Sequence, residues 1–157
     1  MHPNAELITR FYQAFARRDA AGMAACYHAE VHFSDPAFPE LRGAAAAAMW
    51  AMLLARGKDL RIETSGIEAD DYAGRAHWDA TYTFSKTGRM VLNRIDAQFR
   101  FKDGLIVEHI DRFSFARWSR QALGLPGYLL GHSLFLKRKV QAEAAKGLAA
   151  WQASQLA

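Results

Sequence analysis

The chain has 157 residues, of which 51% are hydrophobic, and this length and composition are typical of one domain with a substantial core. Its single cysteine, Cys26, excludes an internal disulfide. The sequence shows no secretory signal and no stretch that is long and apolar enough to cross a bilayer. We therefore expect one domain over residues 1–157, a cytoplasmic location and no membrane insertion.

The net charge of +4 is concentrated at the C-terminal end. From Ala116 onward, six Lys and Arg residues stand against one acidic residue, Glu143, so that this segment carries +5 and residues 1–115 carry −1. A basic helix can indicate nucleic acid or a membrane surface, but no nucleic-acid motif and no interleaving of basic and aromatic residues accompany it. We favour a solvated helix face, or one that packs on an acidic partner subunit, and expect no nucleic-acid partner.

Helical spacing of apolar residues marks the first third of the chain. Residues 4–18 predict an amphipathic helix with Asn4 as N-cap, and Asp19 can cap a second, short helix that runs through Tyr27. A third helix is expected over residues 43–56, with Gly57 as its C-terminal stop. Residues 31–36 lie between the last two and read as a short extended segment that ends at the proline.

After residue 57 the period changes to two. Residues 60–65, 75–84, 93–101 and 105–115 predict strands, and Asp103-Gly104 is a strong hairpin signal between the last two. Helices return over residues 117–123 and about 133–151. The order predicts an α+β fold, in which residues 4–115 form an antiparallel sheet with N-terminal helices and residues 116–157 form a helical extension. Alternation places Trp78, Tyr82, Ile95, Phe99 and Phe101 on the inner face, and Arg94, Asp96 and Arg100 on the outer face.

Several short motifs resemble the NTF2-like superfamily, which includes ketosteroid isomerase, SnoaL-like polyketide cyclases, limonene epoxide hydrolase and non-catalytic domains. The most specific is the hairpin FRFKDGLIVEH at residues 99–109, and weaker matches are Phe11-Tyr12, Arg18-Asp19 and the Ser-Asp-Pro at 34–36. The resemblance covers residues 4–115. It implies a cone-shaped sheet that is closed by helices around an apolar pocket, and dimers formed through the outer sheet face, so we expect a homodimer.

Asp35 is the first candidate for chemistry, because it shares a strand face with Phe33 and precedes Pro36. Its position resembles that of the general base of ketosteroid isomerase, an enzyme whose carboxylate chemistry is well established. A carboxylate that faces an apolar pocket is desolvated, so its pKa rises and it can move a proton next to a carbonyl. The alternative is that Asp-Pro begins a turn and that Asp35 accepts a backbone hydrogen bond.

The oxyanion hole of that isomerase is not reproduced. The resemblance puts Phe11 where the isomerase has a tyrosine, with Tyr12 one residue away and turned by about 100° around the helix. It puts Ala97 where the isomerase has a protonated aspartate, and the adjacent Asp96 should point outward. The sequence therefore argues against steroid isomerisation by the familiar triad.

His109 and Asp111 form a second candidate pair, since residues two apart in a strand face the same way. Asp111 resembles the base of SnoaL-like cyclases, and an acid/base pair with His109 would let Tyr82 or His109 steady an enolate. The alternatives are that His109 and Asp111 only satisfy one another, or that Asp111 pairs with Arg112 or Arg94.

The leading hypothesis is a cofactor-independent isomerase or cyclase that transfers a proton on a small apolar carbonyl compound, with Asp35, Asp111 and His109 as catalytic residues. The alternative is a non-catalytic domain that binds an apolar small molecule or a protein. Neither a metal-ligand spacing nor a glycine-rich phosphate loop is present. The expected substrate-binding residues are Phe11, Tyr12, Phe33, Trp78, Tyr82, Asn93, Phe99 and Phe113. For Asn93 and Tyr82 the alternative is that they form cross-strand hydrogen bonds.

Overall fold

Three helices precede most of the sheet in the computed structural model, which describes residues 1–156. They are α1 (Pro3–Ala16), α2 (Ala20–Ala25) and α3 (Ala44–Arg56). The cap of α1 is His2 and not Asn4, because the His2 ring accepts a hydrogen bond from the Asn4 N–H. Asp19 caps α2 as predicted, by accepting from the N–H of Gly22. Tyr27, which we expected at the end of this helix, instead begins the first strand.

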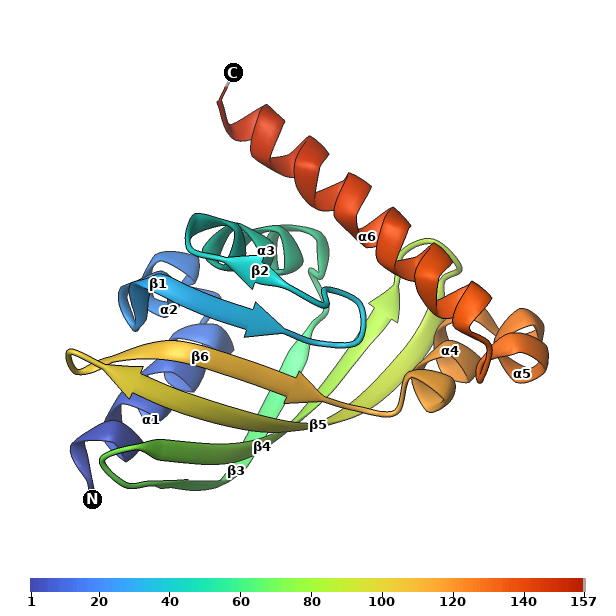
Figure 1. Cartoon of the computed structure of the whole chain (residues 1–157). Helices are drawn as coiled ribbons and strands as arrows, with labels where there is room; N and C mark the ends of the chain where they lie inside the picture. The colour runs from blue at the N-terminus through green and yellow to red at the C-terminus, as the bar shows by residue number, and fades with distance from the viewer. Residues whose placement is uncertain (157) are drawn as a thin grey trace.

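The sheet has six strands in the order β2-β1-β6-β5-β4-β3 (Figure 1). Their bounds are β1 (Tyr27–Ser34), β2 (Leu41–Arg42), β3 (Arg61–Ala69), β4 (Ala73–Phe84), β5 (Arg89–Lys102) and β6 (Leu105–Arg112). The antiparallel meander from β3 to β6 is confirmed. The sheet is nevertheless mixed, because β1 pairs with β6 in parallel, a pairing between distant segments that hairpin spacing cannot reveal.

The predicted turn and the predicted faces of β5 are both confirmed. Asp103 and Gly104 have φ values of 55° and 74°, the left-handed pair that a tight two-residue hairpin needs. Along β5, buried and exposed residues alternate from Val91 to Arg100. On the outer face, the ring nitrogens of His77 each lie 2.8 Å from a carboxylate, of Asp79 and of Asp96. This charged outer face remains the surface through which we expect a homodimer to form.

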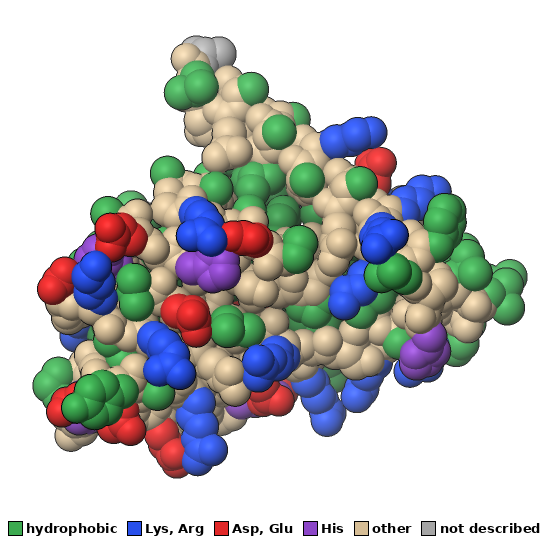
Figure 2. Space-filling view, in the orientation of Figure 1, with side chains coloured by type: hydrophobic (Ala, Val, Ile, Leu, Met, Phe, Trp, Pro, Cys, Tyr) green, Lys and Arg blue, Asp and Glu red, His purple; other side chains and the backbone are tan. Residues whose placement is uncertain are grey.

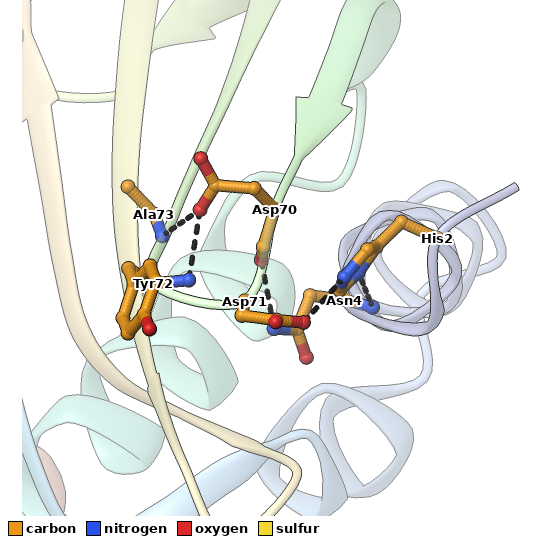
Figure 3. Close-up of polar contacts among 6 residues, drawn as sticks. All are labelled: His2, Asn4, Asp70, Asp71, Tyr72 and Ala73. Carbon is orange, nitrogen blue, oxygen red and sulfur yellow. Dashed lines mark hydrogen bonds and ion pairs between the residues drawn. The ribbon is translucent and has the colours of Figure 1, made fainter.

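Hydrogen bonds tie the start of α1 to the turn between β3 and β4 (Figure 3). His2 Nε2 lies 2.8 Å from Asp71 Oδ1, and Asn4 Nδ2 donates to the Asp70 carbonyl at 3.0 Å. Asp70 in turn accepts from the backbone N–H groups of Tyr72 and Ala73, which closes the turn. These contacts hold α1 against the sheet.

The C-terminal extension consists of α4 (Phe115–Leu123), α5 (Leu125–Leu130) and α6 (Leu134–Gln155). The preceding strand ends at Arg112, earlier than predicted, because Ser114 caps α4. Figure 1 shows α4 and α5 beyond the end of the meander, and α6 running back toward α3. Within residues 1–156, no helix is long and apolar enough to span a membrane.

α6 packs against the rest of the molecule near both of its ends. Leu136 at its start is buried with Trp118 of α4, and Leu148 near its end is buried in the main core. In between, Gln141 Nε2 donates to the carbonyl of Pro36 in the β1–β2 loop at 3.0 Å. Figure 2 shows an indentation with hydrophobic side chains beside α6. The helix therefore runs along α3 and the β1–β2 loop.

Candidate functional site

His109 and Asp111 project from β6 into the interior. The Nε2 atom of His109 lies 2.9 Å from Oδ1 of Asp111, and the residues are 0% and 3% exposed. The indole N–H of Trp78 points to the same carboxylate oxygen at 3.4 Å. Asp111 therefore pairs with His109, and neither Arg112 nor Arg94 is its partner.

A chain of hydrogen bonds continues on the other side of the imidazole. The Tyr27 hydroxyl lies 2.8 Å from Nδ1 of His109 and accepts the Trp50 indole N–H at 2.8 Å. Because the Tyr27 oxygen accepts from Trp50, its own hydrogen is free to go to Nδ1. Every group is then satisfied if His109 carries its proton on Nε2 and donates it to Asp111, a tautomer that we assign from the network.

Aromatic rings enclose this histidine. The ring centroids of Phe99, Phe33 and Phe11 lie 4.4, 5.1 and 5.5 Å from that of His109, and Trp50 stacks on it at 5.9 Å. Three of the expected lining residues, Phe11, Phe33 and Phe99, thus fill the space around the pair. A ligand could reach the imidazole only if these rings moved.

Tyr12 contributes a buried hydroxyl to the same interior. Its side chain packs near Trp78 and Phe99, and its oxygen has no hydrogen-bond partner within residues 1–156. Burial raises the pKa of Tyr12 well above its usual value, and the negative charge of Asp111 adds to the effect. Tyr12 therefore lies within the electrostatic reach of Asp111 and keeps a proton to donate.

Asp35 lies in the loop after β1. Its Oδ1 accepts the backbone N–H groups of Ala37 and Phe38 at 2.8 and 2.6 Å, so it does form the turn that Asp-Pro suggested. Desolvation nevertheless raises the pKa of this half-buried carboxyl to about 7; the charge of Asp111 adds to the rise, and the two backbone donors oppose it. The turn and the poised carboxyl are both present.

Tyr82 of β4 is a further polar residue of this group. Its oxygen accepts the indole N–H of Trp118 at 2.8 Å, and its pKa is raised by burial and also by the charge of Asp35. Tyr82 and Phe113 pack against both the main core and the smaller core of the extension. Asn93 is buried on the inner face of β5, paired in register with Ala80.

Asp35 therefore interacts electrostatically with both Asp111 and Tyr82, although the three residues come from separate segments of the chain. Asp96 points outward, as predicted, because it is exposed and pairs with His77, whereas the adjacent Ala97 is buried. Within residues 1–156, no group of three His, Cys, Asp or Glu side chains is arranged to hold a metal ion.

Two surface grooves lie away from this polar group. One runs beside Phe15, Arg18 and Ile62, and the other beside Arg10, Arg17 and Cys26. Neither is lined by Asp35, His109 or Asp111. The acid/base candidates therefore lie in the packed interior and in the β1–β2 loop.

The sequence from residue 8 to residue 109 matches the SnoaL-like domain, which is well over half of the chain. The chain belongs to the SnoaL-like domain family. The family match ends at His109, so α4, α5 and α6 lie beyond it. No curated protein matches the sequence significantly.

Solved structures of the same fold cover the cone. An NTF2-like protein of unknown function from Burkholderia pseudomallei has a TM-score of 0.67 at 19% identity, covering 77% of this chain and 98% of that one. A putative polyketide cyclase from Xanthomonas campestris has a TM-score of 0.62 at 23% identity, covering 76% and 96%. An LEH-like epoxide hydrolase from M. tuberculosis has a TM-score of 0.63 at 18% identity, covering 82% and 96%. This chain thus has the NTF2-like fold that SnoaL-like proteins share with such enzymes.

Three aromatic residues with polar roles were not predicted from the sequence. Tyr27 and Trp50 orient His109, and Trp118 holds the hydroxyl of Tyr82. Tyr27 could have been found, because it shares the odd-numbered face of β1 with Val31 and Phe33. Trp50 and Trp118 lie on helices, and nothing in their spacing shows which hydroxyl their indoles meet.

Proposed function

We propose that this protein is a cofactor-independent enzyme that transfers a proton on a small, largely apolar carbonyl compound, with Asp35 as the general base. The observation that carries this proposal is the place of the Asp35 carboxyl, which is half-buried just after β1 and accepts the N–H groups of Ala37 and Phe38; desolvation there raises its pKa to about 7. A base with a pKa near the working pH is partly ionised and still basic enough to accept a proton from carbon. Putative polyketide cyclases of the same fold support this reaction class.

In this mechanism the ionised Asp35 removes a proton from the carbon next to the carbonyl. Tyr82 donates a hydrogen bond to the oxygen, where negative charge develops. Its hydroxyl is suited to this because the Trp118 N–H binds to its oxygen and leaves its hydrogen free. The Asp35 acid then returns the proton to the same carbon or to another carbon of the enolate.

His109 and Asp111 act from beneath the substrate in this proposal. Asp35 is half-buried, whereas His109 is fully enclosed, so a ligand that enters from solvent would meet Asp35 first. The fixed charge of Asp111 contributes to the raised pKa of Asp35. Asp111 is therefore a positioning residue that tunes the base, with His109 holding its carboxylate.

The test is proton exchange in D₂O, followed by the loss of α-proton NMR signals from a benzo-fused cyclic ketone such as 2-tetralone. We expect exchange to be faster with the protein than without it, with a sigmoidal pH profile centred at about 7. Asp35→Asn should reduce the accelerated rate by about 10² to 10⁴, as loss of a general base does. Asp96→Asn, on the outer face, is the matched control and should keep the full rate.

A binding domain without turnover is the second candidate, and the rings packed around His109 favour it. A cone filled by aromatic side chains is stable without any ligand. If 2-tetralone and related ketones bind but exchange is the same in Asp35→Asn as in the wild type, the enzyme proposal is wrong and this candidate replaces it.

A further inference from the structure

α5 and the start of α6 carry a group of large hydrophobic side chains on the surface, which we call the apolar tip. Leu129 is 73% exposed and Phe135 is 71% exposed. Figure 1 shows α5 at one end of the molecule, and Figure 2 shows hydrophobic side chains gathered at that end. Contiguous exposed apolar surface of this kind marks an interaction site. The members of the apolar tip are Leu125, Tyr128, Leu129, Leu130, Leu134 and Phe135.

The tip is held in place by a close helix contact. Gly127 is buried in α5, and a side chain there would collide with the backbone of Ser119 in α4, since a Cβ would lie 2.0 Å from the Ser119 carbonyl oxygen. Ser119 is itself fully buried. Because this side of α5 is fixed against α4, its leucine and tyrosine side chains are directed outward and cannot fold back into the core.

The segment that carries the tip is positively charged. Between Phe113 and Ala142 the sequence has five Lys and Arg residues and no Asp or Glu. Within residues 1–156, none of the five lies within ion-pair distance of a carboxylate. The Arg120 guanidinium lies 6.0 Å from the centre of the Tyr128 ring, so charge directly borders the apolar surface. The five are Arg117, Arg120, Lys137, Arg138 and Lys139.

We propose that the apolar tip docks on the surface of an anionic lipid bilayer. Apolar side chains would enter the boundary between headgroups and acyl chains, while the surrounding cations meet the lipid phosphates. A second copy of this chain fits less well, because a two-fold contact through the tip would bring the same five cations face to face. Nucleic acid would pair with the cations but leave the six apolar side chains exposed to water.

The experiment is flotation of the full-length protein with vesicles made of equal amounts of phosphatidylcholine and phosphatidylglycerol, compared with pure phosphatidylcholine. We expect binding to the mixed vesicles, weaker binding at high salt, and little binding to the neutral ones. The double variant Leu129→Ser/Phe135→Ser should lose affinity for the mixed vesicles by a factor of about ten or more. Tyr72→Ser, an exposed aromatic residue at the far end in the β3–β4 turn, is the control and should bind normally.

The charge component has its own pair of variants. Lys137→Gln/Lys139→Gln should weaken binding to the anionic vesicles about thirtyfold, since two cations that are attracted to such a surface are lost. The control Arg61→Gln/Arg94→Gln removes the same charge from the sheet and should have no effect.

Three results would overturn this proposal: no binding of the wild type to anionic vesicles, equal binding to both vesicle types, or equal losses in the tip variants and their controls. If Leu129→Ser/Phe135→Ser instead converts an oligomer into a smaller species, the tip is a subunit interface. If a short RNA binds and only the charge variant loses it, the partner is nucleic acid. No readout depends on turnover, so these outcomes are independent of the proposed function.

Discussion

Nε2 of His109 lies 2.9 Å from Oδ1 of Asp111, in a part of the molecule that water does not reach. A buried polar pair of this kind is costly to break, because removing one partner leaves the other without compensation. On its other side, His109 also satisfies the Tyr27 hydroxyl. The pair therefore has a structural role whether or not it has a chemical one.

His109→Ala should lower the free energy of unfolding by about 3 to 5 kcal/mol, since it leaves a cavity and removes the hydrogen-bond partner of both Asp111 and Tyr27. Urea denaturation followed by far-UV circular dichroism measures this directly. His77→Ala, on the outer face, should cost about 1 kcal/mol or less. Equal losses in the two variants would contradict the arrangement described for the interior.

Asp35→Asn should raise the thermal midpoint near pH 8. The pKa of Asp35 rises from 3.8 to about 7 on folding, so the native state holds this proton more tightly than the unfolded state does. This contribution is neutral below about pH 4, becomes increasingly unfavourable as pH rises to about 7, and is constant above it. The asparagine removes the charge and keeps an oxygen for the two backbone donors.

The gain should be on the order of 1 to 3 kcal/mol at pH 8 and should vanish at pH 4, as read from midpoints across the range. Asp35→Ala removes the acceptor for the Ala37 and Phe38 N–H groups, so its gain should be smaller or reversed. A lower midpoint for Asp35→Asn at pH 8 would mean that the charge stabilises the turn, and the base assignment would be wrong.

Asp111→Asn should lower the pKa of Asp35, because it removes a negative charge that opposes ionisation. The measurement is a ¹³C NMR titration of side-chain carboxyl groups, in which the signal of Asp35 is assigned by its loss in Asp35→Asn. Asp96→Asn, at an exposed position, is the control and should leave the midpoint at about 7. If the Asp35 midpoint is unchanged in a folded Asp111→Asn protein, the two carboxyls do not interact electrostatically.

Leu148→Ser should detach the C-terminal half of α6 from the core, at a cost of about 2 to 3 kcal/mol. Hydrogen exchange of the α6 amides is the direct readout, and exchange should increase there more than in the sheet. Leu156→Ser makes the same chemical change at a residue that is 90% exposed, and it should alter nothing. Uniform loss of protection across the molecule would show that α6 and the sheet unfold as one unit.

Much of the cone was predictable from local patterns. The alternation along β4 and β5 assigned both faces, and the Asp103-Gly104 pair fixed a hairpin, because each depends on neighbouring residues only. The parallel pairing of β1 with β6 joins segments more than 70 residues apart and leaves no local mark. The cap at His2 was missed because a histidine ring is an uncommon acceptor at that position.

The candidate site was predictable in its residues more than in its connections. His109, Asp111 and Asp35 were found because spacing and the family resemblance point to them. The bonds from Trp50 to Tyr27 and from Trp118 to Tyr82 join side chains of separate elements, so only the packed fold reveals them. The closeness of the aromatic packing around His109 is likewise a property of the assembled core.

The hydrogen bond from Gln141 to the carbonyl of Pro36 links α6 to the residue that follows Asp35. The same helix begins in the apolar tip at Leu134, so one rigid rod connects the exposed end of the molecule with the loop that buries the carboxyl. A displacement of α6 would break this hydrogen bond to the loop of Asp35, so we expect the solvation of Asp35, and with it its pKa, to change. The pKa of Asp35 should therefore depend on the position of α6.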